Sequence, residues 1–177
     1  LVLKNASHVN VVSEAFIPYF ERNKINTSSW TTYTNGVDSI FLKKASKKKS
    51  SYPIVLLYVG NIGHAQDLSS IIPEVALKLG NKYKFRIVGD GSMREHLEKE
   101  LLKRNVTNVE IIKPVKREKI PCYFEQADIL FLHLKSINAF KRVIPSKLFE
   151  YIASGSKIIG GLQGYSACFL KENAPHS

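Results

Sequence analysis

The sequence has few cysteines and no long apolar run, and both absences limit the kinds of protein it can encode. Its two cysteines, Cys122 and Cys168, have no second cysteine or histidine at metal-ligand spacing, so we expect neither a disulfide framework nor a zinc site. No apolar stretch approaches the ~20 residues of a membrane-spanning helix. A hydrophobic content of 44% and a charged content of 23% are ordinary for a globular chain with one sizeable core.

The amino terminus shows neither an initiator methionine nor the pattern of a signal peptide. The 177 residues begin Leu1-Val2-Leu3-Lys4, which suggests a piece of a longer protein. Two cysteines without a disulfide pattern fit a reducing compartment, so we expect a cytoplasmic protein.

Positive charge is in excess, with 26 Lys and Arg against 15 Asp and Glu and a formal net charge of +11. Such an excess implies an anionic partner, but it does not choose among nucleic acid, an acidic membrane surface and a nucleotide diphosphate. Lysines crowd residues 43–53, between two patterned regions, and a solvated linker is a simpler interpretation than a binding patch. These lysines are Lys43, Lys44, Lys47, Lys48 and Lys49.

From residue 54 onward, segments with the period of strands alternate with segments with the period of helices. Residues 54–59 form an apolar run typical of a buried parallel strand, and helical spacing follows over 68–79, where Pro73 predicts a late start or a bend. Further strands are expected at 85–88, 109–112, 129–132 and from 158. The alternation predicts an α/β fold, a doubly wound parallel sheet whose ligands bind beyond the carboxyl ends of the strands.

The segment from Val143 to Gly155 predicts a helix whose start could bind a phosphate. Pro145 suits the first turn, and Gly155 can end the helix. The exposed N–H groups of such a start attract an anion, and Glu150, one turn further in, could accept hydrogen bonds from ribose hydroxyls. An amphipathic helix that only packs against the core is the alternative.

Two glycine-bearing turns follow the first two strands of this region. Glycines at 60 and 63 would let a phosphate approach the backbone closely. The turn Gly89-Asp90-Gly91 lacks the third glycine of a dinucleotide fingerprint, which would fall on Arg94. Ser92 and Glu95 then predict a capping box at the start of the next helix.

Four segments follow one another along the chain: Thr34 to Asp38, Tyr58 to Asp67, Ile87 to Gly91, and Pro145 to Gly161. In this order they resemble the carboxy-terminal half of nucleotide-sugar glycosyltransferases of the GT-B fold. That large retaining family, the glycosyl transferases group 1, includes many bacterial capsule and lipopolysaccharide enzymes. The resemblance implies a Rossmann-like nucleotide-sugar-binding domain over 54–177, truncated at its carboxy end. Residues 1–42 would be the tail of the amino-terminal acceptor domain and the crossover.

The resemblance also implies which residues bind the donor. Where the family usually has two glutamates with seven residues between them, Glu150 matches the second and Arg142 stands at the first, so a covalent mechanism is in doubt and the catalytic residues stay unknown. Relatives often hold the pyrophosphate with Arg and Lys of the first loop, and here Asn61 and Gln66 replace them, as in a surface-polysaccharide subgroup. The implied donor-binding residues are Gly60, Asn61, Gly63, Gln66, Gly89, Gly91, Val115, Lys116, Arg142, Ser146, Lys147 and Glu150.

The function implied is transfer of a sugar from a nucleotide diphosphate, with a UDP sugar favoured, to a lipid-linked or polysaccharide acceptor. Basic residues would neutralise the leaving diphosphate without a metal or other cofactor. We expect the fragment to be inactive without its acceptor domain, and the full protein could associate peripherally with the inner face of the membrane. Alternatives are a nucleotide-sugar epimerase of the same fold and a basic nucleic-acid-binding module. The aromatic residues fall at core-periodic positions rather than among the lysines, so no nucleic acid partner is expected.

Overall fold

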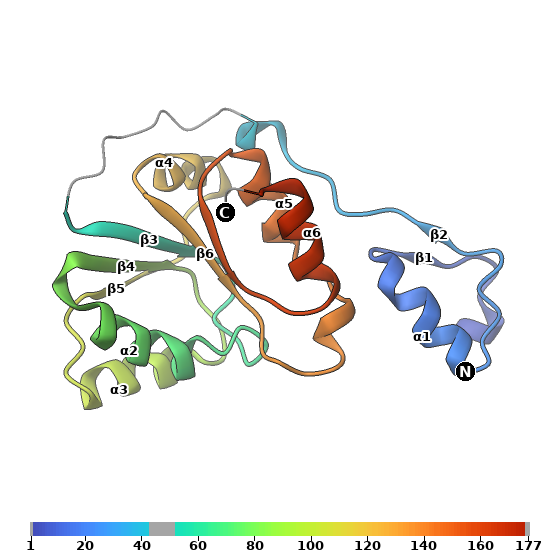
Figure 1. Cartoon of the computed structure of the whole chain (residues 1–177), viewed down its shortest axis with the longest axis horizontal. Helices are drawn as coiled ribbons and strands as arrows, with labels where there is room; N and C mark the ends of the chain where they lie inside the picture. The colour runs from blue at the N-terminus through green and yellow to red at the C-terminus, as the bar shows by residue number, and fades with distance from the viewer. Residues whose placement is uncertain (1, 43–51, 176–177) are drawn as a thin grey trace.

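The computed structural model describes residues 2–42 and 52–175, and its main body is built on one five-stranded sheet (Figure 1). Every neighbouring pair of strands is parallel, and the order is β5-β4-β3-β6-β7. Most of the predicted linker, 43–51, with its five lysines, lies outside the described residues. The strands are β3 (Ile54–Val59), β4 (Tyr83–Val88), β5 (Val109–Ile112), β6 (Ile129–His133) and β7 (Ile158–Gly161).

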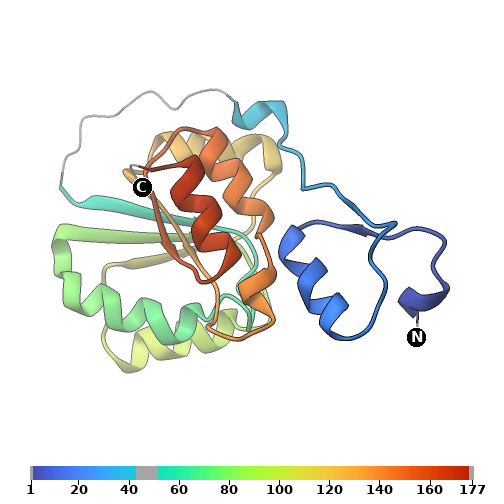
Figure 2. The same ribbon diagram turned by 45° about the vertical axis from the view of Figure 1, so that its right-hand side comes forward.

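Helices cover both faces of this sheet (Figures 1 and 2), which confirms the doubly wound α/β fold. On one face α2 packs against α3, and on the other lie α4, α5 and α6. The strand order runs outward from β3 to β5 and then continues at β6 on the other side of β3, so the order switches between β3 and β6. Ligands of such sheets bind near that switch point. The helices are α2 (Leu68–Leu79), α3 (Arg94–Lys103), α4 (Ile120–Glu125), α5 (Ser146–Ala153) and α6 (Tyr165–Asn173).

The first described residues form a small unit beside the main body (Figure 1). Its two short strands pair in parallel, Asn10 with Thr31 and Val11 with Thr32. The last 3₁₀ turn, η3 (Ser39–Phe41), buries Phe41 against the main body, where its ring lies 5.6 Å from that of Phe124. The other elements are η1 (Val2–Asn5), β1 (Asn10–Val11), η2 (Glu14–Phe16), α1 (Ile17–Arg22) and β2 (Thr31–Thr32).

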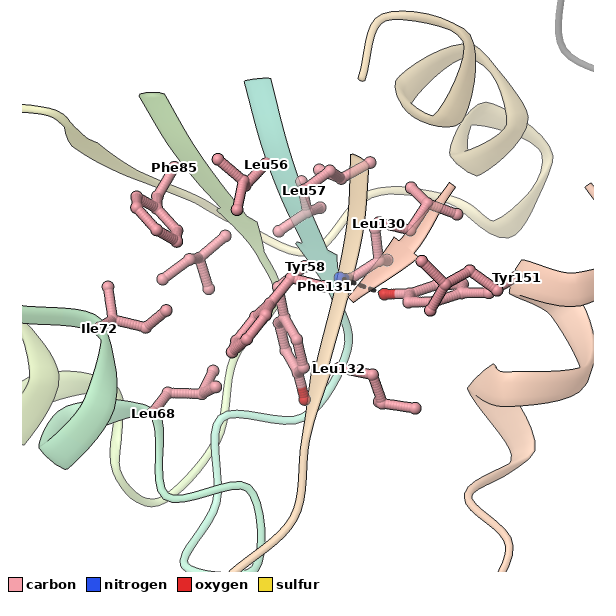
Figure 3. Packing of buried hydrophobic residues seen from close by; sticks show 14 of the residues in the cluster. Leu56, Leu57, Tyr58, Leu68, Ile72, Phe85, Leu130, Phe131, Leu132 and Tyr151 are labelled. Atoms are coloured by element: carbon pink, nitrogen blue, oxygen red, sulfur yellow. Dashed lines mark hydrogen bonds between the residues drawn. The ribbon is translucent and has the colours of Figure 1, made fainter. Parts of the chain in front are cut away.

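Two buried tyrosines tie the end of β3 to its surroundings (Figure 3). The hydroxyl of Tyr151, on α5, accepts a hydrogen bond of 3.1 Å from the backbone N–H of Val59. The hydroxyl of Tyr58 donates to the carbonyl of Asn61 at 2.6 Å. Burial raises the pKa of both phenols, so both stay neutral hydrogen-bonding groups at physiological pH. Together they fix where the chain leaves β3 and enters the following loop.

Two local predictions were wrong, because contacts from distant parts of the chain replace local ones. The capping box at Ser92 and Glu95 does not form: α3 begins at Arg94, and the preceding residue, Met93, donates its N–H to the carbonyl of Ile62 at 2.9 Å. Glu95 instead pairs with Lys99 at 2.7 Å.

Of the late start or bend predicted for α2 at Pro73, the late start is wrong. The helix begins at Leu68, directly after Asp67, so Pro73 stands in its interior. Pro73 cannot donate to the carbonyl four residues earlier, that of Ser69. Pro73 is itself buried, and the burial of its ring stabilises this position in the helix.

Candidate functional site

A cavity of about 300 Å³ opens at the carboxyl ends of β3, β4 and β5. The loops that follow the three strands surround it, as expected for a parallel sheet. Four of the predicted donor-binding residues, Gly60, Asn61, Gly89 and Val115, meet here. The full lining is Val59, Gly60, Asn61, Val88, Gly89, Asp90, Pro114, Val115 and Ile120.

The two glycine-bearing loops lie directly against each other. The N–H of Gly60 donates to the carbonyl of Val88 at 2.8 Å, and the N–H of Ile62 donates to the carbonyl of Asp90 at 2.7 Å. Gly89 has a φ of +155°, and a β-carbon added there would overlap the carbonyl of Gly60. A β-carbon added at Gly91 would lie 2.5 Å from the carbonyl oxygen of Ile62. These glycines are therefore required by the packing of loop on loop, in addition to any approach of a ligand.

The first loop is braced by its own polar side chains. The amide oxygen of Gln66 accepts from the side-chain nitrogen of Asn61 at 3.3 Å and from the N–H of Gly63 at 3.2 Å. His133, at the end of β6, bonds the carbonyl of Gln66 at 2.8 Å through its Nδ1. Asn61 is exposed and lines the cavity, whereas Gly63 and Gln66 support the loop from behind.

Lys147 brings a positive charge from α5 to this loop. Pro145 is the N-cap residue of α5, one position earlier than a first-turn residue, and Ser146 is exposed at the first helical position. The Lys147 stem occupies the space in which a side chain at Gly60 would stand. Its ammonium lies 5.9 Å from the centre of the Tyr58 ring. Burial lowers the pKa of Lys147, and the nearby Glu150 carboxylate partly opposes that shift.

Glu150 is held by an arginine that the sequence did not single out. Arg117, in η5 (Arg117–Lys119), donates from Nη2 to Oε1 of Glu150 at 2.9 Å. Its Nε donates to Oδ2 of Asp38 at 3.4 Å, and its guanidinium lies 5.0 Å from the centre of the Phe41 ring. Lys116, just before η5, is exposed. No periodicity or motif marks Arg117, because its partners come from two distant parts of the chain.

Arg142 points elsewhere. It ends η6 (Phe140–Arg142), and its guanidinium stacks 4.2 Å from the centre of the Tyr19 ring on α1. Its Nε is buried and has no hydrogen-bond partner among residues 2–42 and 52–175. The structure thus places Arg142 at the contact with the first 42 residues rather than in the lining of the cavity.

Within 2–42 and 52–175, no group of three or more His, Cys, Asp or Glu side chains is arranged to hold a metal ion. In the same part of the chain, no helix has the length and apolar character needed to span a membrane.

The fold and the loop cluster define a Rossmann-like domain with a cavity at the carboxyl ends of its strands, and the family follows from the sequence. The model of the family "Glycosyl transferases group 1" matches residues 39–166, most of the chain. The chain belongs to this family of GT-B fold glycosyltransferases.

Relatives of known sequence or structure agree with this placement. WcaI of Escherichia coli K12, named for a glycosyl transferase role in colanic acid biosynthesis, is 28% identical over 112 residues, which are 63% of this chain and 27% of WcaI. Anabaena HepE, solved in complex with UDP and glucose, superposes with a TM-score of 0.72 at 16% identity, over 93% of this chain and 47% of HepE. Staphylococcus aureus TarM, solved with UDP among its ligands, superposes with a TM-score of 0.69 at 18% identity, over 90% of this chain and 31% of TarM. The chain thus spans about a quarter of WcaI and less than half of HepE.

Proposed function

We propose that this chain is the donor-binding part of a glycosyltransferase that moves a sugar from a UDP sugar, with retention, to a lipid-linked or polysaccharide acceptor. The observation that carries the proposal is the cavity at the ends of β3, β4 and β5, with the Lys147 cation packed on the Gly60 loop beside it. An anion bound there would meet the Lys147 ammonium, while the N–H groups of Gly60 and Ile62 already bond to carbonyls of the neighbouring loop.

The parts of the nucleotide can be assigned to parts of this site. The diphosphate lies at the Gly60 loop, near Lys147, which supplies the charge that relatives place in the loop itself. The base lies against Val115 and backbone groups of its loop, and the ribose lies toward Glu150. Gly89 and Gly91 allow the second loop to pack against the first beside the bound donor. Arg142 does not touch the donor in this proposal and instead packs on Tyr19.

The acceptor site belongs, in this proposal, to a domain of which residues 1–42 are the tail. WcaI is named for colanic acid biosynthesis, which favours a role in cell-surface polysaccharide synthesis at the cytoplasmic face of the membrane. The +11 charge suits both the nucleotide diphosphate and a peripheral contact with anionic lipid.

Calorimetric titration of the 177-residue chain tests the proposal. We expect saturable binding of UDP, weaker binding of GDP and ADP, and no turnover of UDP sugars, because the cleft that orients both substrates needs the acceptor domain. Thermal unfolding gives a second readout, since a ligand at ~100 times its dissociation constant stabilises the folded state by ~2.7 kcal/mol. Absence of binding at millimolar UDP would refute the proposal. Robust transferase activity of this chain alone would refute the assignment of the acceptor site to another domain.

UDP binding is expected to persist when divalent metal is removed. The Lys147 ammonium and the N–H groups at the start of α5 can neutralise the diphosphate directly. The measurement is the dissociation constant of UDP in EDTA against that in excess Mg²⁺, and we expect the two to agree within about threefold. A loss of more than tenfold in EDTA would show that a metal bridges protein and diphosphate.

A further inference from the structure

We propose that Arg117 is a positioning residue for donor binding, which holds the Glu150 carboxylate in place and ties it to the segment that enters the domain. This inference rests on the proposed function, because it assigns Glu150 to the ribose. It concerns a residue that lies outside the cavity lining and carries no recognisable motif.

Three contacts fix the guanidinium of Arg117. Its Nη2 donates to Glu150 at 2.9 Å, and its Nε donates to Asp38 at 3.4 Å. Its Cζ atom lies 5.0 Å from the centre of the Phe41 ring. Asp38 is itself oriented, since it is the N-cap residue of η3 and accepts a bond of 3.2 Å from the N–H of Ile40. Arg117 therefore connects three segments: the residues before the linker, the loop after β5 and helix α5.

The Glu150 side chain needs this partner because little water reaches it. Only 16% of the side chain is exposed, against 50% for Arg117, and a carboxylate withdrawn from water requires compensating charge. Arg117 occupies Oε1, and within the described residues Oε2 accepts no hydrogen bond. One carboxylate oxygen is thus immobilised, which leaves the other to accept from a hydroxyl group.

Arginine suits this task better than lysine would. Its planar fork presents donors in fixed directions, so that Nη2 and Nε can bond two carboxylates at once. A lysine could supply the charge but would not set the direction in which Oε2 points. The second carboxylate, Asp38, keeps the fork turned toward Glu150, and its more exposed pair at 3.4 Å is the weaker of the two.

The test measures whether the chain distinguishes a ribose from a 2′-deoxyribose. We compare the dissociation constants of UDP and 2′-deoxyuridine diphosphate for the native chain and for Arg117→Gln, Arg117→Lys and Glu150→Gln. The native chain is expected to prefer UDP by roughly tenfold, in line with one hydrogen bond to a charged group. Arg117→Gln should lose most of this preference, as should Glu150→Gln, and Arg117→Lys should keep part of it.

The double variant decides whether Arg117 acts through Glu150. If it does, adding Arg117→Gln to Glu150→Gln should change the preference for UDP by less than about twofold. Asp38→Asn should reduce the preference by about twofold to threefold in the native background and leave it unchanged beside Arg117→Gln. The matched control is Arg104→Gln, which removes an arginine from the Arg104–Glu100 pair on α3 and should leave both dissociation constants as they are.

A purely structural role for Arg117 predicts a different pattern. Arg117→Gln would then lower the affinity for both nucleotides by the same factor, or for neither, and either result overturns the inference. The proposed function still stands in that case if the native chain binds UDP. Independent, multiplicative effects of Arg117→Gln and Glu150→Gln on the UDP preference would also overturn it. No binding of UDP by the native chain would defeat the proposed function and the inference together. If Arg117→Gln fails to fold by circular dichroism, Arg117→Lys and Asp38→Asn carry the same comparison.

Discussion

Replacing Lys147 with methionine is expected to weaken UDP binding roughly 10- to 100-fold, because hydrogen bonds to charged groups contribute about 1.5–3 kcal/mol and each 1.4 kcal/mol is about tenfold. Methionine keeps an unbranched stem over Gly60, so the packing of the loop survives while the charge is lost. Calorimetry with UDP measures the effect, and urea unfolding shows whether the fold is retained.

The control for this substitution is Lys82→Met. Lys82 is an exposed lysine immediately before β4, at the end of the sheet opposite to the cavity, and its loss should leave the UDP dissociation constant within about twofold. If Lys147→Met and Lys82→Met bind UDP alike, Lys147 does not contact the diphosphate. The assignment of the diphosphate to the Gly60 loop would then lose its main support.

The lowered pKa of Lys147 adds a pH dependence of known sign. Burial disfavours the charged form, so the ammonium loses its proton at a lower pH than an ordinary lysine, whose pKa is about 10.4. UDP affinity should therefore fall as pH rises toward this lowered pKa, and the fall should be missing from Lys147→Met. Comparison of the two proteins cancels the titration of the uracil ring itself.

Gly89→Ala is expected to lower the free energy of unfolding by about 2–4 kcal/mol. An alanine there must adopt a φ of +155°, and its β-carbon would overlap the backbone carbonyl of Gly60. Backbone cannot rotate away as a long side chain can, so the two loops must separate. Chemical unfolding measures the loss, and UDP binding should weaken in parallel because the cavity lies between those loops.

Gly36→Ala is the matched control. Gly36 also lies in a loop, but a β-carbon added there meets nothing within 4 Å. Its effect on the free energy of unfolding should be within about 0.5 kcal/mol. Equal losses from the two substitutions would contradict the interlocked loops and would indicate a general cost of replacing loop glycines.

The sheet could be predicted from the sequence because its signals are local. Residues 54–59 and 109–112 form strands with the predicted bounds. The first is a continuous apolar run, as expected for a buried parallel strand, and the second is a half-buried edge strand rich in β-branched residues. The site was predictable to the extent that it follows from topology. Gly60, Gly89 and Val115 each follow a strand, and the carboxyl ends of parallel strands meet at one edge.

What the sequence could not predict depends on contacts between distant residues. The start of α3 is set by the bond from Met93 to the carbonyl of Ile62, which no local pattern reveals. Arg117 becomes significant only when folding brings Asp38 and Glu150 to either side of it. Arg142 stacks on Tyr19, a contact that depends on a segment more than a hundred residues earlier in the chain.

The packing of the Lys147 stem on Gly60 has a consequence for sequence change and for engineering. A residue larger than glycine at position 60 would have to adopt a φ of +140° and would displace the end of the Lys147 side chain, so a substitution in the loop also moves the cation on the helix. A loop grafted from a relative that places a side chain at position 60 would therefore also shift the Lys147 ammonium. A chimera therefore keeps this cation in its place when the Gly60 loop and helix α5 come from the same parent protein.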